Sequence, residues 1–306
     1  MILVAIGLSA VTLLVMAMVM SYILGWANNA FHVEVDPRVD ATLKALPGAN
    51  CGGCGFVGCG DYAEAVVAGK TAVNKCTVGG ESVAKDIGNI MGIEVGASFP
   101  YRPIVHCGAH HDERLGRHEY RGEMRCAAAN LVAGVQGCTY GCLGIGDCTR
   151  ACKFDAIHVV NGLAKVDYDK CVGCGACAEV CPRNIITITP FKAGWMMAVA
   201  CANKDAGKDV TAVCTVGCIG CKACERTAKS YFKVVDNLST INYDAYDAST
   251  ECYEELTAAC KKCPRSRLVF VGHPTAKDLA AVADKELPEV VMADFKTTVD
   301  DTEWRG

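Results

Sequence analysis

The chain lacks the sequence features of several common protein classes. It contains no block of basic residues, which excludes a nucleic-acid-binding arm and predicts no nucleic-acid partner. Aromatic residues make up only 7% of the chain, which suits small domains built around inorganic groups. A catalytic triad and a glycine-rich phosphate loop are both missing, so we expect no catalytic residues and no complete active site for NAD chemistry on this chain.

Charged side chains are absent from the first 27 residues. Residues 2–26 form a mostly apolar run of 25 residues, long enough to cross a bilayer with some tilt. A cleaved signal peptide is the competing interpretation, but it would carry a basic start, and no Lys or Arg precedes Arg38. The sequence therefore predicts a retained, single-pass anchor that contacts membrane lipid through residues 2–26.

Cysteine, in contrast, is abundant, with 22 in a chain of 306 residues that is too long for a small disulfide scaffold. Four cysteines have gaps of two, two and three residues, and a proline follows the last of them: Cys171, Cys174, Cys177 and Cys181. This bacterial ferredoxin run holds a [4Fe–4S] cluster, and in two-cluster ferredoxins its fourth cysteine ligates the neighbouring cluster. The run therefore predicts a partner run and a reducing compartment. Structural zinc, the alternative, uses two separated Cys-x-x-Cys knuckles.

A second cysteine run precedes the first, at gaps of three, five and three residues: Cys138, Cys142, Cys148 and Cys152. We interpret it as the partner run, with insertions and with Lys153 in place of the usual proline. Exchange of the fourth cysteines predicts two clusters. The ligands would be Cys138, Cys142, Cys148 and Cys181 for one cluster, and Cys171, Cys174, Cys177 and Cys152 for the other. Short strands are expected after the runs, at residues 154–160 and 184–188.

A further four-cysteine set lies nearer the N-terminus, at gaps of two, four and sixteen residues: Cys51, Cys54, Cys59 and Cys76. Glycines around it allow the chain to wrap tightly around a cube, which predicts another [4Fe–4S] cluster. An unusual zinc site is the alternative. A helix is expected over residues 61–70, between the third and fourth cysteines of the set.

The segment from about residue 195 onwards repeats the preceding arrangement in a degenerate form. In this repeat Cys201 resembles Cys107, and we expect Cys214 to match Cys126. The fourth cysteine of its first run is replaced by Ala228.

One ligand set survives in the repeat, with a Cys-Pro pair as the remote fourth ligand: Cys218, Cys221, Cys224 and Cys263. This set predicts a fourth [4Fe–4S] cluster, and a degenerate fold without metal is the alternative. Six cysteines stay unassigned: Cys107, Cys126, Cys201, Cys214, Cys252 and Cys260.

These features predict an α+β fold: a single N-terminal transmembrane helix followed by small iron–sulfur domains, including a two-cluster bacterial-ferredoxin-like domain and a degenerate second ferredoxin-like module. The expected parts are an anchor (1–27), a connector (28–46), a four-cysteine [4Fe–4S] domain (47–100), the two-cluster domain (101–192), the degenerate module (193–264) and a C-terminal tail (265–306).

The order of these motifs resembles the B subunit of the Rnf complex, which is also related to the Rsx system. The resemblance covers about residues 1–225 and rests on Leu46-Pro-Gly-Ala-Asn-Cys51-Gly-Gly-Cys54-Gly, on Gly137-Cys138-Thr-Tyr-Gly-Cys142-Leu-Gly, and on the ferredoxin run. It implies an electron-transfer subunit of a membrane-bound, ion-translocating ferredoxin:NAD oxidoreductase. The expected cofactors are the [4Fe–4S] clusters named above.

The resemblance also implies partners: soluble ferredoxin and the integral membrane, flavin-carrying and NAD-linked subunits of the complex. Because oxygen-sensitive clusters belong in the cytoplasm, we expect the cluster domains on the cytoplasmic side of the cell inner membrane. Two alternatives stay open. One is a membrane-anchored polyferredoxin of another dehydrogenase or hydrogenase, and the other is a zinc-stabilised structural protein without redox activity.

Overall fold

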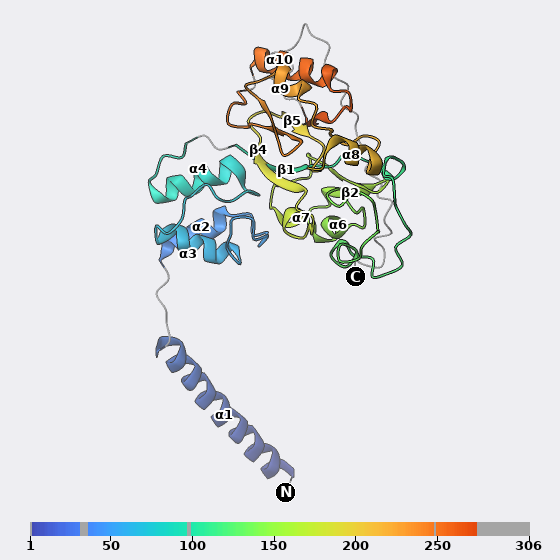
Figure 1. Cartoon of the computed structure of the whole chain (residues 1–306). Coiled ribbons are helices and arrows are strands. Elements are labelled where there is room, and N and C mark those ends of the chain that lie inside the picture. The colour runs from blue at the N-terminus through green and yellow to red at the C-terminus, as the bar shows by residue number, and fades with distance from the viewer. Residues whose placement is uncertain (1, 31–35, 97–98, 248, 274–306) are drawn as a thin grey trace.

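A computed structural model describes residues 2–30, 36–96, 99–247 and 249–273 of the chain (Figure 1). The helices are α1 (Ile2–Ala30), α2 (Pro37–Ala45), α3 (Cys59–Val67), α4 (Gly80–Met91), the 3-10 turn η1 (His111–Glu113), α5 (Cys126–Ala129), α6 (Asp147–Ala151), α7 (Ala176–Glu179), α8 (Gly207–Val213), α9 (Ala223–Thr227) and α10 (Thr250–Lys262). The strands are β1 (Tyr101–Val105), β2 (Ile157–Val160), β3 (Leu163–Val166), β4 (Ile186–Pro190), β5 (Trp195–Val199), β6 (Phe232–Val235), β7 (Leu238–Ile241) and β8 (Leu268–Gly272). Most of the expected C-terminal tail lies outside the described residues.

Helix α1 stands apart from the folded domains in Figure 1. Its segment Ile6–Ala30 has 25 residues and a mean hydropathy of 2.1, so it is long and apolar enough to cross a membrane. None of this segment is buried against the rest of the protein. No charged residue interrupts it, and every backbone hydrogen bond of a helix is made within the helix itself. The expected mixed helix and strand content and the N-terminal apolar helix are therefore present.

Three helices form the N-terminal domain. Helix α2 begins at Pro37, and the Asp36 side chain caps it by accepting a hydrogen bond from the Arg38 backbone N–H at 2.9 Å. Helices α2, α3 and α4 then bury one small apolar core around Tyr62 and Ile87. The helix expected over 61–70 is present as α3, which starts earlier, at Cys59, and ends at Val67.

Two modules of similar topology follow the N-terminal domain. In the first module (residues 101–190), β1 pairs with β4 around the hairpin β2–β3; in the second (195–272), β5 pairs with β8 around the hairpin β6–β7. The four sheets of the described residues are all antiparallel and two-stranded. Because β8 pairs with β5, the second module extends beyond the boundary expected at residue 264.

Matching hydrogen bonds show that the modules are structural repeats. The Tyr168 hydroxyl donates to the carbonyl of Pro103, at the middle of β1, and the Tyr243 hydroxyl donates to that of Met197, at the middle of β5, both at 3.0 Å. Each tyrosine follows the hairpin of its own module and ties it to the first strand. The internal repeat expected from the sequence is therefore present.

The repeat also fixes which cysteines are equivalent. The segment Cys138-Thr-Tyr-Gly-Cys142 matches Cys214-Thr-Val-Gly-Cys218, and the next positions follow in register. Arg183 donates hydrogen bonds to the carbonyls of Cys138 and Gly141. In the second module, Arg265 donates to the carbonyls of Cys214 and Gly217. The expected match of Cys214 with Cys126 is wrong, because the arginine contacts make Cys214 the equivalent of Cys138.

One ferredoxin ligand set of the second module is replaced by apolar side chains. Cys181 stands four, seven and ten positions after Cys177, Cys174 and Cys171. At the same intervals before Cys263, α10 carries three core side chains: Tyr253, Leu256 and Ala259. Together with Ala228, at the position of Cys152, these residues are at most 2% exposed. We call this group of four residues the apolar plug.

Candidate iron–sulfur sites

Four cysteines line one cavity of about 330 Å³ in the N-terminal domain: Cys51, Cys54, Cys59 and Cys76. The loop reaches around it because Gly52 and Gly55 adopt positive φ angles of 79° and 86°, which glycine tolerates without strain. Asn50 holds the loop closed by accepting a hydrogen bond from the Cys59 backbone N–H at 2.8 Å. Burial raises the pKa of the Cys76 thiol, and the other three thiols nearby raise it further.

A second cavity, of about 340 Å³, lies in the first module and joins the ends of two runs: Cys152, Cys171, Cys174 and Cys177. Cys152 comes from the run before β2, and the other three come from the loop before and at α7. The backbone N–H of Ala156 donates to the Cys152 sulfur at 3.4 Å. Burial raises the pKa of Cys177 to about 12, and the thiols of Cys171, Cys174 and Cys152 add to this effect.

A third cavity, of about 380 Å³, lies in the second module between α9 and the end of α10: Cys218, Cys221, Cys224 and Cys263. Its remote cysteine accepts a hydrogen bond from the backbone N–H of Arg267 at 3.4 Å. The Cys224 sulfur lies 3.1 Å from the Ser239 hydroxyl on β7. The structure thus brings together all four cysteines of the set that the sequence analysis placed in this module.

The fourth expected set is only partly brought together. Burial raises the pKa of Cys148 well above its ordinary value, and the neighbouring thiols that raise it further include those of Cys142, Cys126 and Cys181. Cys138, expected in this group, instead lines a different cavity with Cys107 and two cysteines of the second module. Cys126 packs against the small core that contains Leu143 and Ile145, which makes it the candidate for the place expected for Cys138.

Cys126 is placed by the loop that leads into α6. Burial raises the pKa of its thiol, while backbone N–H groups of residues 145–147 donate to the sulfur and act in the opposite direction. In the second module the position of Ile145 is occupied by Cys221. Cys142, Ile145, Cys148 and Cys152 also reproduce the two, two and three spacing of a ferredoxin run. Cys126 is therefore a candidate to provide the thiol that is missing at position 145.

The cysteines around these cavities do not converge on a single point, as the ligands of one metal ion would. Among residues 2–30, 36–96, 99–247 and 249–273, no three Cys, His, Asp or Glu side chains converge closely enough to hold a single ion. A zinc ion needs four ligand atoms at about 2.0–2.3 Å from one point. The geometry therefore favours a larger inorganic group over the zinc alternative, and the thiolate donors are those that iron–sulfur clusters use.

Four-cysteine cavities on a doubled ferredoxin-type framework define an iron–sulfur protein. Two family models match the chain: "Putative Fe-S cluster" over residues 46–78 and "4Fe-4S binding domain" over residues 164–187. The first match contains all four cysteines of the N-terminal cavity, and the second contains the run that begins at Cys171.

Three relatives resemble most of the chain. The B subunit of the Na(+)-translocating ferredoxin:NAD(+) oxidoreductase complex of Acetobacterium woodii is 40% identical over 76% of this chain and 71% of its own length. The B subunit of the ion-translocating oxidoreductase complex of Methanosarcina acetivorans is 38% identical over 74% and 86%. The B subunit of the proton-translocating ferredoxin:NAD(+) oxidoreductase complex of Clostridium ljungdahlii is 35% identical over 83% and 88%. The chain belongs to this family, the B subunits of ion-translocating (Rnf-type) oxidoreductase complexes.

Proposed function

We propose that this chain carries electrons between soluble ferredoxin and the membrane and NAD-linked subunits of its complex. The observation that carries the proposal is the series of four-cysteine cavities running through the domains. A [4Fe–4S] cluster bound in such a cavity takes up or releases one electron at a time. Ferredoxin and NAD enter the proposal through the names of the relatives, and the cysteine cavities are the part that this chain contributes.

The proposed ligands form four sets, two of them in a two-cluster ferredoxin-like module. The sets are Cys51, Cys54, Cys59 and Cys76; Cys126, Cys142, Cys148 and Cys181; Cys152, Cys171, Cys174 and Cys177; and Cys218, Cys221, Cys224 and Cys263. In this assignment Cys126 replaces Cys138, and the other ligands are those expected from the sequence. The exchange of Cys152 and Cys181 between runs follows the pattern of two-cluster ferredoxins.

Contacts between the sets support an electron path. A Cβ atom added to Gly53, between Cys51 and Cys54, would lie 3.0 Å from the Cα of Cys174, so the first two cavities adjoin. Cys148 and Cys177 lie in the same core cluster, and the Cys177 thiol is close enough to raise the pKa of Cys148. The first three of these sets therefore adjoin one another through their own ligand loops.

The residues of the chain hold and tune the clusters and need not donate protons. Backbone N–H groups that donate to the sulfurs of Cys76, Cys152 and Cys263 stabilise thiolate charge. Apart from the exposed Cys221, the ligand cysteines are buried or partly buried, which limits the water around the sulfurs and strengthens these interactions. Each sulfur thus has its own environment, through which the protein sets the potential of a cluster.

We further propose that α1 crosses the cell inner membrane once and keeps the cysteine domains on the cytoplasmic side. The helix carries no charge and has no buried share, which is expected of a segment surrounded by lipid. It would contact lipid through residues 2–26. The expected domain boundaries belong to the same proposal, with the second module extended to Gly272.

Anaerobic titration with reduced soluble ferredoxin tests the proposal. The purified chain should be brown, and its visible absorbance should bleach when reduced ferredoxin is added. Cys252→Ala is the matched control, because Cys252 is buried in the apolar core and belongs to none of the proposed ligand sets. Bleaching by dithionite but not by ferredoxin would refute the proposed donor, and a colourless iron-free protein would refute the electron path as a whole.

A further inference from the structure

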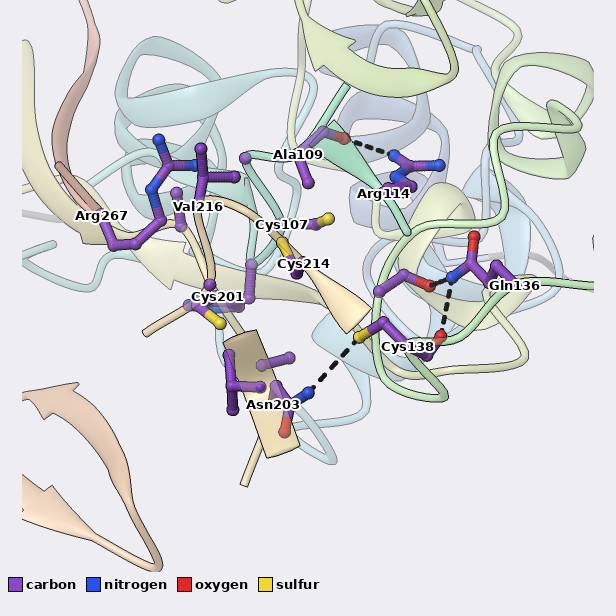
Figure 2. Close-up of a pocket in the computed structure, with 17 residues that line it drawn as sticks. Cys107, Ala109, Arg114, Gln136, Cys138, Cys201, Asn203, Cys214, Val216 and Arg267 are labelled. Atoms are coloured by element: carbon purple, nitrogen blue, oxygen red, sulfur yellow. Dashed lines mark hydrogen bonds between the residues drawn. The ribbon is translucent and has the colours of Figure 1, made fainter. Parts of the chain in front are cut away.

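Four cysteines outside the sets above line a cavity between the two modules: Cys107, Cys138, Cys201 and Cys214. The space between its lining atoms, open solvent included, is about 410 Å³, compared with about 330–380 Å³ for the other three cavities described above. Figure 2 shows the four cysteines around one opening, each on a different segment of the chain. We infer that this cavity binds a fifth [4Fe–4S] cluster, with these four thiolates as its ligands.

The repeat gives the site its symmetry. Cys107 follows β1 by two residues and Cys201 follows β5 by two residues, so these cysteines are equivalent. Cys138 and Cys214 are equivalent by their shared Cys-Thr-x-Gly-Cys segment and their arginine contacts. Each module therefore contributes two ligands from the same two positions. Because half of the ligands come from each repeat, the four cysteines form no short spacing motif that could be recognised in the sequence.

The backbone fixes the two halves against each other beside the cavity. Leu115 N–H donates to the carbonyl of Val213 at 3.0 Å, and Thr215 N–H donates to that of Glu113 at 2.9 Å. These bonds flank a β-bridge between Arg114 and Cys214. The position of Cys214 relative to the first module is therefore set by main-chain hydrogen bonds, independently of any bound group.

Glycine leaves room at the sulfurs. A Cβ atom added to Gly141 would lie 3.4 Å from the Cys138 sulfur and 3.7 Å from the Cys107 sulfur. A Cβ atom added to the equivalent Gly217 would lie 3.6 Å from the Cys214 sulfur. The two glycines are thus matched in position, and each faces the sulfur of the cysteine three residues before it, which brings small residues against the ligands as in the other cysteine loops.

The cavity also contains charge and hydrogen-bond donors suited to an anionic cluster. Arg114 lines it and is only 5% exposed, and its Nε and Nη1 atoms have no hydrogen-bond partner among the described residues. The Asn203 side-chain amide lies 3.6 Å from the Cys138 sulfur and donates to it. The Nη2 atom of Arg114 donates to the carbonyls of Ala109 and Gly162, so these two bonds orient the guanidinium. A [4Fe–4S] cluster with four thiolates carries negative charge in both redox states and would balance the positive charge of this buried side chain.

This inference rests on the proposed function and completes its electron path. The backbone N–H of Cys218, a ligand of the second module's set, donates to the Cys201 sulfur at 3.3 Å. On the other side, Cys107 packs against the core cluster that contains Cys142 and Cys148. A cluster held by these four thiolates would be reduced by one electron while a reduced neighbouring cluster lost that electron, with no proton required. The site would thus connect the clusters of the two modules.

The test is an iron and acid-labile sulfide count on the full chain, purified anaerobically. Five cubes predict about 20 iron atoms per chain, and four predict about 16. The double variant Cys107→Ala/Cys201→Ala should fall to about 16 iron atoms, whereas the controls Cys252→Ala and Cys260→Ala should keep about 20. Both control cysteines lie in or against the apolar core of the second module, outside the five sets.

The outcomes separate the inference from the proposed function. A wild-type count near 16 with no change in the double variant would overturn the fifth cluster alone, and one zinc ion per chain that the variant loses would do the same. No iron at all would overturn the proposed function. If the double variant does not fold, the variant Arg114→Gln provides the test instead, because it retains all four thiols of the site. It should make one reduction potential more negative at an unchanged iron count, and unchanged potentials would contradict the site.

Discussion

Truncation of one side chain in the apolar plug tests whether that group has replaced a cluster. Leu256 is completely buried, in the same core as Trp195, Tyr253 and Ala259. Truncating a buried leucine to alanine removes its burial and leaves a cavity, at a cost of about 2–5 kcal/mol. For Leu256→Ala we expect a loss near the middle of that range, about 3 kcal/mol, because helix α9 and strand β8 pack against α10 and limit the collapse of the site.

The assay is an anaerobic urea titration followed by the fluorescence of Trp195, which is 1% exposed and packs 6.1 Å from the ring of Tyr253. With a slope of about 1–3 kcal/mol per molar urea, a loss of about 3 kcal/mol lowers the midpoint by ~1–3 M. The iron count should not change. Leu131→Ala is the control, since Leu131 is 87% exposed and its truncation should cost at most about 0.5 kcal/mol. Loss of iron from Leu256→Ala without loss of stability would refute the apolar plug.

Three further predictions concern the ligand loops and the anchor. Arg183→Ala and Arg265→Ala should each accelerate iron loss to a chelator, because each removes two hydrogen bonds to the loop of one module; equal rates to wild type would contradict this. Burial raises the pKa of Cys177 to about 12 and that of Cys201 to about 11, so both thiols hold protons that cluster binding must displace; reconstitution with iron and sulfide should load more iron at about pH 8.5 than at about pH 6.5, and a flat profile would count against buried thiol ligands. Deletion of residues 1–30 should release the protein from membranes at an unchanged iron count, as measured by sedimentation with vesicles.

Local spacing made part of the candidate sites predictable. The ferredoxin run at Cys171–Cys181 and the N-terminal set around Cys51 have their short-range ligands within one loop, where gaps along the chain determine what can be reached. The remote positions of Cys152 and Cys263 followed from the exchange rule and from the Cys-Pro pair. The structure brings both cysteines to the cavities expected for them.

Long-range placement was not predictable from gaps. Cys126 lies sixteen positions before Cys142, and no spacing rule relates the two. Cys138 resembled the first member of a run, although Cys142 begins the ferredoxin spacing and Ile145 occupies its second position. A signal was present, because aligning Cys138–Cys142 with Cys214–Cys218 sets Ile145 opposite Cys221. Helix α10 was not predicted for a different reason. The repeat suggested a cysteine loop in this segment, whereas the matching positions are the apolar residues Tyr253, Leu256 and Ala259.

The apolar plug also bears on the order in which the chain matures. The core of the second module is mostly hydrocarbon and aromatic, built from Trp195, Phe232, Tyr246 and the residues of α10, whereas cysteines make up a third of the fully buried core of the first module. A domain whose core consists largely of cluster ligands folds fully only when metal binds, whereas a domain with an apolar core can fold without metal. We therefore expect the second module, although made later, to fold first and to present Cys201 and Cys214 ready-placed while the first module still awaits iron and sulfide.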